Sequence, residues 1–129
     1  PDPVPGRTLP ALELTDERQE PVSLRGLLPA VVILLDDCTC TGQVGAAAAA
    51  VPAGVRVVTV VDDGRVPAPA DSGVRSLGDP AGALRAFLHL PEQPGTATAL
   101  LVDRTGRVLR VVPGAGPVEA YRADLARLG

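Results

Sequence analysis

The pattern of apolar and polar positions divides the chain into short segments. Leu12 and Leu14 alternate with polar neighbours, and Val22 and Leu24 resume this alternation after the polar stretch 15–20. An alternation with a period of two residues is typical of a strand with one buried face, and a polar turn between two such runs is typical of a hairpin. The first part of the chain therefore predicts a β-hairpin or two short edge strands.

A different pattern follows at residues 31–35, where five β-branched or leucine residues are consecutive (VVILL). Such a run predicts a strand that is covered on both faces and is therefore central in a sheet. After it, Thr41 is a candidate cap for an Ala-rich helix from about Gly42 to Val51, and residues 55–61 form another strand of the buried type. Because a βαβ crossover joins parallel strands, the two strands are expected to be parallel.

The rest of the chain predicts five more elements. Residues 74–77 are a short strand, and residues 80–90 are a helix after the N-cap Asp79. Residues 98–102 and 108–112 form a hairpin around the turn 103–106. The apolar face of a last helix contains Val118, Tyr121, Leu125 and Leu128. The order predicts one α/β domain at residues 9–129, preceded by a linker or leader remnant at residues 1–8.

Composition excludes several classes of function. The formal net charge is -3, and Phe87 and Tyr121 are the only aromatic residues, so the chain lacks the basic, aromatic surface that nucleic-acid binding requires. All twelve basic residues are arginine, which excludes Schiff-base chemistry and phosphate binding by lysine. We therefore expect no nucleic-acid partner.

No segment is long and apolar enough to be a membrane-spanning helix. The apolar stretch 26–35 has ten residues, and the uncharged stretch 38–55 contains Thr, Gln, Gly and Pro, whereas a spanning helix needs about 20 apolar residues. We expect no membrane contact by the domain itself. The Pro-rich leader suggests that an N-terminal signal or anchor has been removed, which favours an extracytoplasmic and possibly tethered protein.

The local sequences and their order resemble the thioredoxin-like superfamily, and in particular TlpA-like thiol:disulfide oxidoreductases and the alkyl hydroperoxide reductase/thiol-specific antioxidant family. The resemblance is carried by the stretches 9–27, 31–40, 79–90 and 96–114. It implies a central mixed sheet flanked by helices, with an N-terminal β-hairpin extension. It also implies that the strand at 31–35 leads directly to the redox cysteines. The residues just before the hairpin at 98–112 are then expected to contact the substrate.

The sequence departs from this family at two positions. The usual C-x-x-C motif is replaced by Cys38-Thr39-Cys40, and Thr41 stands where the second cysteine would be. The position of the family's cis-proline is Ala97. Because a cis bond at Thr96-Ala97 would cost about 3 kcal/mol, we expect a trans bond and an altered substrate-binding edge at Thr96 and Ala97.

Cys38 and Cys40 are the candidate catalytic residues. A thiol between a buried strand and the first turn of a helix meets the positive end of the helix dipole, which favours the thiolate. The resemblance assigns Cys38 as nucleophile and Cys40 as resolving thiol in an enzyme that acts on protein thiols with a redox partner protein. Asp36 and Asp37 oppose thiolate formation. A C-x-C disulfide closes a small, strained ring, so the couple should be comparatively oxidising.

Two alternatives remain open for the cysteines. They could form a static disulfide in a noncatalytic interaction module, or they could bind Cu(I), which suits a pair of thiolates. A structural zinc site would need four ligands, and His89 is the one histidine. We interpret His89 as a residue near a helix C-terminus, and we predict no metal and no organic cofactor.

Three further features have structural interpretations. Asp62 and Asp63 follow a strand at the edge where open α/β sheets bind ligands, and they are either a substrate contact or, as we favour, the start of a solvated loop. Asp103 and Gly106 are predicted turn residues, and Tyr121 is predicted to belong to the core.

Overall fold

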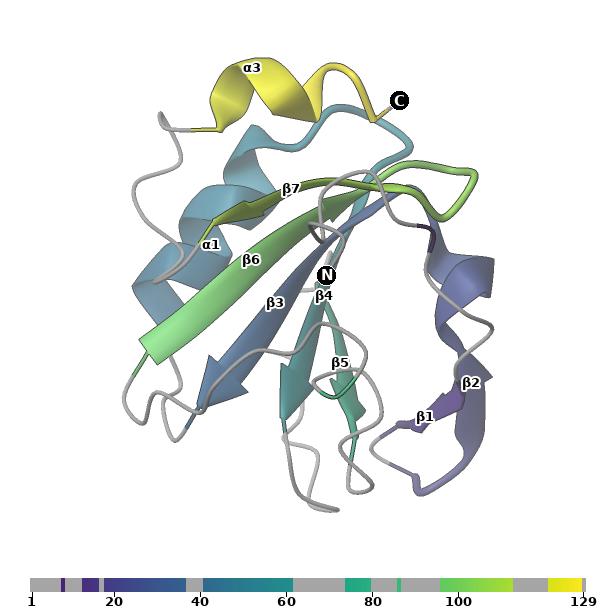
Figure 1. Ribbon diagram of the computed structural model, residues 1–129. Helices are drawn as coiled ribbons and strands as arrows, with labels where there is room; N and C mark the ends of the chain where they lie inside the picture. Colours follow the sequence, from purple (N-terminus) through teal and green to yellow (C-terminus); the bar gives the residue numbers. More distant parts are fainter. Residues whose placement is uncertain are drawn as a thin grey trace.

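The apolar run at residues 31–35 forms β3 (Ala30–Asp36), the centre of a mixed sheet, in the computed structural model of this protein. The structure describes residues 8, 13–16, 18–36, 41–61, 74–79, 86, 96–112 and 121–128. Within these ranges the sheet has seven strands in the order β2-β1-β5-β4-β3-β6-β7 (Figure 1). The predicted fold class, a central mixed sheet with helices and an N-terminal hairpin, is confirmed.

The βαβ unit has the predicted form. The helix α1 (Thr41–Ala50) follows β3 and leads to β4 (Arg56–Val61), which pairs with β3 in parallel from Ala30↔Arg56 to Leu35↔Val61. The helix begins at Thr41, one residue before the predicted start. The strand β5 (Val74–Gly78) pairs with β4, also in parallel.

The other strands are antiparallel to their neighbours. On one side of β3, β6 (Thr96–Val102) pairs with β3, and β7 (Val108–Val112) pairs with β6 at the edge. On the other side, β1 (Glu13–Thr15) and β2 (Pro21–Ser23) form the predicted hairpin, and β1 pairs with β5 at Thr15↔Gly78. A 3-10 helix, η1 (Leu24–Leu27), then leads back to β3.

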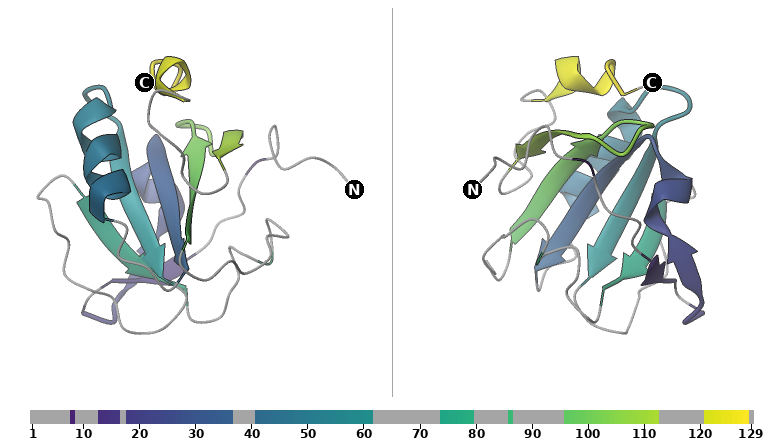
Figure 2. Two further views of the ribbon diagram at one scale, coloured as in Figure 1. Left: turned by 90° about the vertical axis from the view of Figure 1, so that its left-hand side faces the viewer. Right: turned by 45° about the vertical axis from the view of Figure 1, so that its right-hand side comes forward.

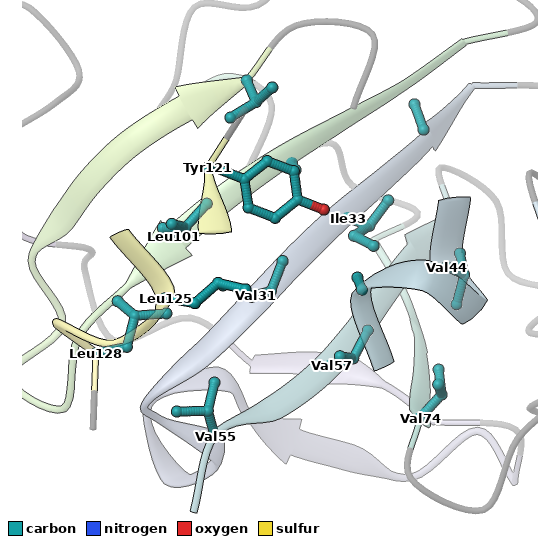
Figure 3. Packing of buried hydrophobic residues seen from close by; sticks show 14 of the residues in the cluster. Val31, Ile33, Val44, Val55, Val57, Val74, Leu101, Tyr121, Leu125 and Leu128 are labelled. Atoms are coloured by element: carbon teal, nitrogen blue, oxygen red, sulfur yellow. The ribbon is translucent and has the colours of Figure 1, made fainter. Parts of the chain in front are cut away.

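Each face of the sheet is covered by its own core. On one face, Val31, Ile33 and Leu35 of β3 pack with residues of α1 and of the C-terminal segment (Figure 3). On the other face, Ala30, Val32 and Leu34 pack with residues of η1 and of the hairpin formed by β1 and β2, which we call the leader hairpin. The alternation explains why the sequence of β3 is apolar at every position from 30 to 35, since both of its faces are removed from water.

The C-terminal helix is shorter than predicted. The helix α3 (Arg122–Leu125) is a single turn, and the chain then tightens, with the N–H of Leu128 donating to the carbonyl of Leu125 at 3.1 Å. Tyr121, Leu125 and Leu128 are nevertheless all buried, as the apolar spacing predicts. Figure 3 shows Tyr121 and Leu125 lying over Val31 and Ile33. The position of Val118 is outside the described residues.

Two further predicted segments fall largely outside the described residues. Ala86 is helical, in agreement with the predicted helix at 80–90, but Phe87 and His89 are not described. The predicted loop at 62–71 is also outside the described residues. Its flanks are described, because β4 ends at Val61 and β5 begins at Val74.

The turn between β6 and β7 is organised by one carboxylate. The Asp103 Oδ1 accepts hydrogen bonds from the Thr105 N–H at 2.9 Å, the Thr105 hydroxyl at 2.6 Å and the Arg107 N–H at 3.0 Å. Gly106 has a φ of +91°, which favours glycine. Partial burial alone would raise the pKa of Asp103, but these hydrogen bonds and nearby Arg107 outweigh burial and lower the pKa. The predicted turn roles of Asp103 and Gly106 are confirmed.

Replacing Leu100 by alanine tests the core on the face of the sheet that is covered by the leader hairpin and η1. The side chain is fully buried among residues of that core, so Leu100→Ala should lower the free energy of unfolding by about 2–5 kcal/mol. Urea denaturation followed by circular dichroism measures this change. The matched control, Ala46→Ser on the exposed side of α1, should change it by no more than about 0.5 kcal/mol. Equal effects of the two substitutions would contradict the packing described above.

The Asp103 turn should make stability depend on pH. Because folding lowers the pKa of Asp103, its ionised form stabilises the fold above the unfolded pKa, and this contribution disappears as the pH falls through the folded pKa. Asp103→Ala should cost about 1 kcal/mol near neutral pH, and the difference should shrink below about pH 4. Asp103→Asn keeps an acceptor oxygen and should retain part of the stability. A wild-type minus Asp103→Ala difference that is constant with pH would show that the carboxylate charge has no role.

Candidate functional site

The candidate site is the connection between the central strand and the first helix. Four residues, 37–40, link Asp36 at the end of β3 to Thr41 at the start of α1. Cys38 and Cys40 belong to this connection, and both lie outside the described residues. The predicted roles of these two thiols therefore stay predictions, and the described flanks define what surrounds the connection.

The carboxyl ends of three parallel strands lie level at this edge. Leu35 pairs with Val61, and Val61 pairs with Gly78, so β3, β4 and β5 end side by side (Figure 2). The N–H of Asp79 donates to the carbonyl of Val61 at 2.8 Å, which ties the end of β5 to the end of β4. The edge is the one where open α/β sheets bind ligands. Asp62 and Asp63 directly follow β4 in sequence but are outside the described residues.

Thr96 and Ala97, the predicted substrate-binding residues, lie beside the end of β3. They pair with Asp36 and Leu35, respectively. The strand β6 begins at Thr96, two residues earlier than predicted, so both residues lie inside the strand. The side chain of Ala97 is 1% exposed and packs in the core that contains Leu35 and Val44. A contact of Ala97 with a substrate would therefore have to use its backbone, and the binding role remains a prediction.

The helix α1 presents its N-terminus to the same connection. Val44 and Ala47 are buried against the sheet and hold the helix in place. The first turn contains no acidic residue and the last turn contains no basic residue. No side chain of opposite charge in these two turns therefore neutralises the ends of the helix dipole. The positive end at the N-terminus favours an anion such as a thiolate.

Polar residues of the leader hairpin hold the last parallel strand, a role that the sequence analysis missed. The Thr15 hydroxyl donates to the carbonyl of Gly78 at 3.3 Å. The Asp16 carboxylate accepts from the N–H groups of Arg18 at 2.8 Å and Glu20 at 2.9 Å and lies 3.8 Å from the Arg75 guanidinium. The Glu20 N–H is the largest cause of the lowered pKa of Asp16, against burial, and Arg18 and Arg75 lower it further. An Asp at the start of a polar turn signals the local part of this arrangement.

The described residues were compared with the requirements of a metal site and of a membrane-spanning helix. Within these ranges, no three His, Cys, Asp or Glu residues are grouped so as to hold a metal ion. The described helices also include none that is long and apolar enough to cross a membrane.

Comparison with known proteins identifies the fold. No protein-family model matches the sequence, and no curated protein matches it. Among solved structures, a thio-disulfide isomerase from Thermus thermophilus has a TM-score of 0.65 at 21% identity, with 97% of this chain and 96% of that chain covered. The exposed lipoprotein thioredoxin of Streptococcus pneumoniae has a TM-score of 0.67 at 18% identity, with 91% and 98% covered.

A third similar structure is that of a cytochrome c oxidase assembly protein. BsSco, a member of the Sco family of cytochrome c oxidase assembly proteins for which a disulfide switch was identified, has a TM-score of 0.64 at 16% identity, with 98% of this chain and 95% of that chain covered. Likeness at these identities over nearly whole chains establishes the fold. This chain has the thioredoxin-like fold, as its sequence predicts.

Proposed function

We propose that this protein is a thiol:disulfide oxidoreductase that acts on protein thiols through Cys38 and Cys40. The observation that carries the proposal is that both cysteines belong to the four-residue connection between the central strand β3 and α1. Cys40 directly precedes the first residue of α1, and Cys38 follows β3 by two residues. Near a helix N-terminus the thiolate form is favoured, and the thiolate is the reactive form.

The proposed reaction has two exchange steps. In the reducing direction, the Cys38 thiolate attacks one sulfur of a substrate disulfide, forming a mixed disulfide and releasing one substrate thiolate, which takes up a proton. Cys40 then loses its proton and attacks the Cys38 sulfur, which forms the Cys38–Cys40 disulfide and releases the second substrate thiol. Two electrons pass from the protein to the substrate, and a separate redox partner protein resets the pair.

The direction of the reaction follows from the C-x-C spacing. A disulfide between cysteines two residues apart closes a small ring, and strain of this kind makes the bond easier to reduce. The proposed enzyme is therefore a comparatively oxidising couple that donates or reshuffles disulfides, with substrate docked beside Thr96 and Ala97. A persisting disulfide requires an oxidising compartment, and one similar structure is an exposed lipoprotein thioredoxin. Both support an extracytoplasmic setting, with a tether at the N-terminus.

Single cysteine variants test the two roles. Cys38→Ser should abolish the exchange between the reduced protein and the disulfides of native insulin or of a disulfide-containing model peptide, because the attacking sulfur is lost. Cys40→Ser should stop after one step and accumulate a mixed disulfide with the substrate, which mass spectrometry detects. Thr39→Ala, which changes the same connection but keeps both thiols, should retain activity. If wild type and Cys38→Ser have the same activity, the protein is a noncatalytic module.

The neighbouring carboxylates should set the reactivity of the thiol. Negative charge at Asp36 and Asp37 disfavours the thiolate, so Asp36→Asn and Asp37→Asn should each lower the pKa of Cys38. The rate of alkylation by iodoacetamide near neutral pH should rise by up to about fivefold per substitution. Asp103→Asn, at the opposite end of β6 from Thr96, is the matched control and should leave the rate unchanged. An unchanged rate in all three variants would remove the carboxylates from this account.

Copper(I) binding is the second candidate, and it rests on the C-x-C spacing of two soft thiolate ligands. Native mass spectrometry after incubation with Cu(I) distinguishes it from disulfide exchange. One ion bound by wild type and lost in Cys40→Ser, with no exchange activity in either protein, would favour this alternative. An absence of bound ion would remove it.

A further inference from the structure

The leader hairpin is joined to the rest of the sheet by a short contact. Its strand β1 pairs with β5 at one position, Thr15↔Gly78, where the Thr15 hydroxyl also donates to the Gly78 carbonyl at 3.3 Å. In contrast, β4 pairs with β5 along the whole of β5. Within β1 and β2, Leu14 is the one buried residue. The attachment of the hairpin beside β5 therefore depends strongly on its polar contacts (Figure 1).

The carboxylate of Asp16 connects the turn of the hairpin to β5. One of its oxygens, Oδ1, accepts hydrogen bonds from the N–H groups of Arg18 at 2.8 Å and Glu20 at 2.9 Å. The other oxygen, Oδ2, lies 3.8 Å from a terminal guanidinium nitrogen of Arg75 in β5. A single ionised group thus closes the turn and also attracts the neighbouring strand.

The turn needs this carboxylate because its backbone is in an unfavourable conformation. Gln19 has a φ of +63°, which residues other than glycine rarely adopt. The turn is closed by two backbone hydrogen bonds of 3.0 Å, from the Gln19 N–H to the Asp16 carbonyl and from the Asp16 N–H to the Glu20 carbonyl. Hydrogen bonds to an ionised acceptor are stronger than those to a neutral one. Neutralising the carboxylate therefore weakens the turn.

The contact between Asp16 and Arg75 depends on charge in the same way. A distance of 3.8 Å is longer than an N–H···O hydrogen bond, so the attraction is that of two opposite charges. The Arg75 Nε is buried and has no hydrogen-bond partner among the described residues, although the side chain as a whole is 42% exposed. Without a counter-charge, this side chain has little to hold it beside the hairpin, and its guanidinium can turn toward water.

The charged groups around Asp16 favour its ionised form. Among the described residues, Arg75 of β5 and Arg18 of the turn are the charges that act on this carboxylate, and Glu20 acts through its N–H. The Glu20 N–H is the largest cause of the lowered pKa of Asp16, and burial opposes it. Because the attached hairpin lowers this pKa, proton uptake by Asp16 favours the detached hairpin.

We propose that the leader hairpin is a pH-sensitive strap, attached to β5 while Asp16 is ionised and released from β5 when Asp16 takes up a proton, with the rest of the sheet still folded. The stabilising contribution is complete above the ordinary pKa of aspartate, about 3.9, and is lost as the pH falls through the lowered pKa. The next element, η1, keeps the released segment 13–23 joined to the domain, because Leu24 and Leu27 are buried. The strap does not depend on the proposed redox activity.

Hydrogen exchange measured by mass spectrometry tests the strap. The protection factor of a peptide covering residues 13–23, corrected for the intrinsic rate at each pH, should fall at least about fivefold between about pH 6 and about pH 3. A peptide covering β6 should stay protected at both pH values, which shows that the sheet is folded. Loss of all protection in both peptides at the same pH would overturn the proposal.

Two variants assign the effect to the charge pair. Asp16→Asn imitates the protonated carboxyl, so its hairpin protection should already be about fivefold lower at pH 6 and should change less than about twofold on acidification. Arg75→Gln should also lower hairpin protection at pH 6. The matched control for Arg75→Gln is Arg110→Gln, which breaks the 2.8 Å pair with Asp124 and should leave hairpin protection unchanged. Equal hairpin protection in wild type and Asp16→Asn at both pH values would refute the strap.

Asp103→Asn separates release of the hairpin from unfolding of the whole domain. The Asp103 turn keeps its hydrogen bonds when only the hairpin opens, so this variant should lower the protection of β6 and leave that of residues 13–23 unchanged. Equal losses in the two peptides would mean that the hairpin opens only with the whole fold, and would overturn the proposal. Exchange with insulin disulfides that persists without a strap would refute this inference alone.

Discussion

Burial of β3 on both faces is the constraint on which the rest of the structure depends. A strand that is removed from water must pair its backbone N–H and carbonyl groups on both edges, since unpaired buried groups are costly. The strand β3 meets this requirement by pairing along its whole length with β6 and over six residues with β4. The chain that leaves β3 therefore emerges in the middle of the sheet edge. The connection that contains both cysteines begins at that point.

The two faces of the sheet are completed by different parts of the chain. The helix α1 and the C-terminal segment cover one face, whereas the leader hairpin and η1 contribute to the other. The C-terminal segment needs only a single helical turn, because three buried side chains reach the sheet from it. Packing of an apolar face, rather than helix length, keeps such a short element in place.

The topology decides which residues stand at each end of the parallel strands. Parallel strands bring all their amino ends to one edge and all their carboxyl ends to the other. In this chain Arg56 stands at the start of β4, while Asp36 and Asp79 stand at or just after the ends of β3 and β5.

Local patterns predicted the parts of this structure that depend on neighbouring residues. The central position of β3, the leader hairpin and the Asp103 turn followed from runs of apolar residues and from turn chemistry that acts over a few positions. The length of the final helix was wrong, because an apolar spacing is equally compatible with a single turn followed by tight i→i+3 turns. The start of β6 was placed too late, because Thr96 and Ala97 extend the strand by pairing with Asp36 and Leu35, which are distant in the chain.

The sequence by itself determined most of the strand segments, most of the residues that enter the core, and the position of the two thiols after the central strand, because these depend on short-range periodicity and composition. The tertiary structure alone decided what meets at each end of the sheet. Asp16 reaches Arg75, Arg25 packs on the turn at Gly106, and Thr8 joins Arg107. These contacts join residues that are far apart in the chain, and their partners are selected by strand order and register, which no local pattern specifies.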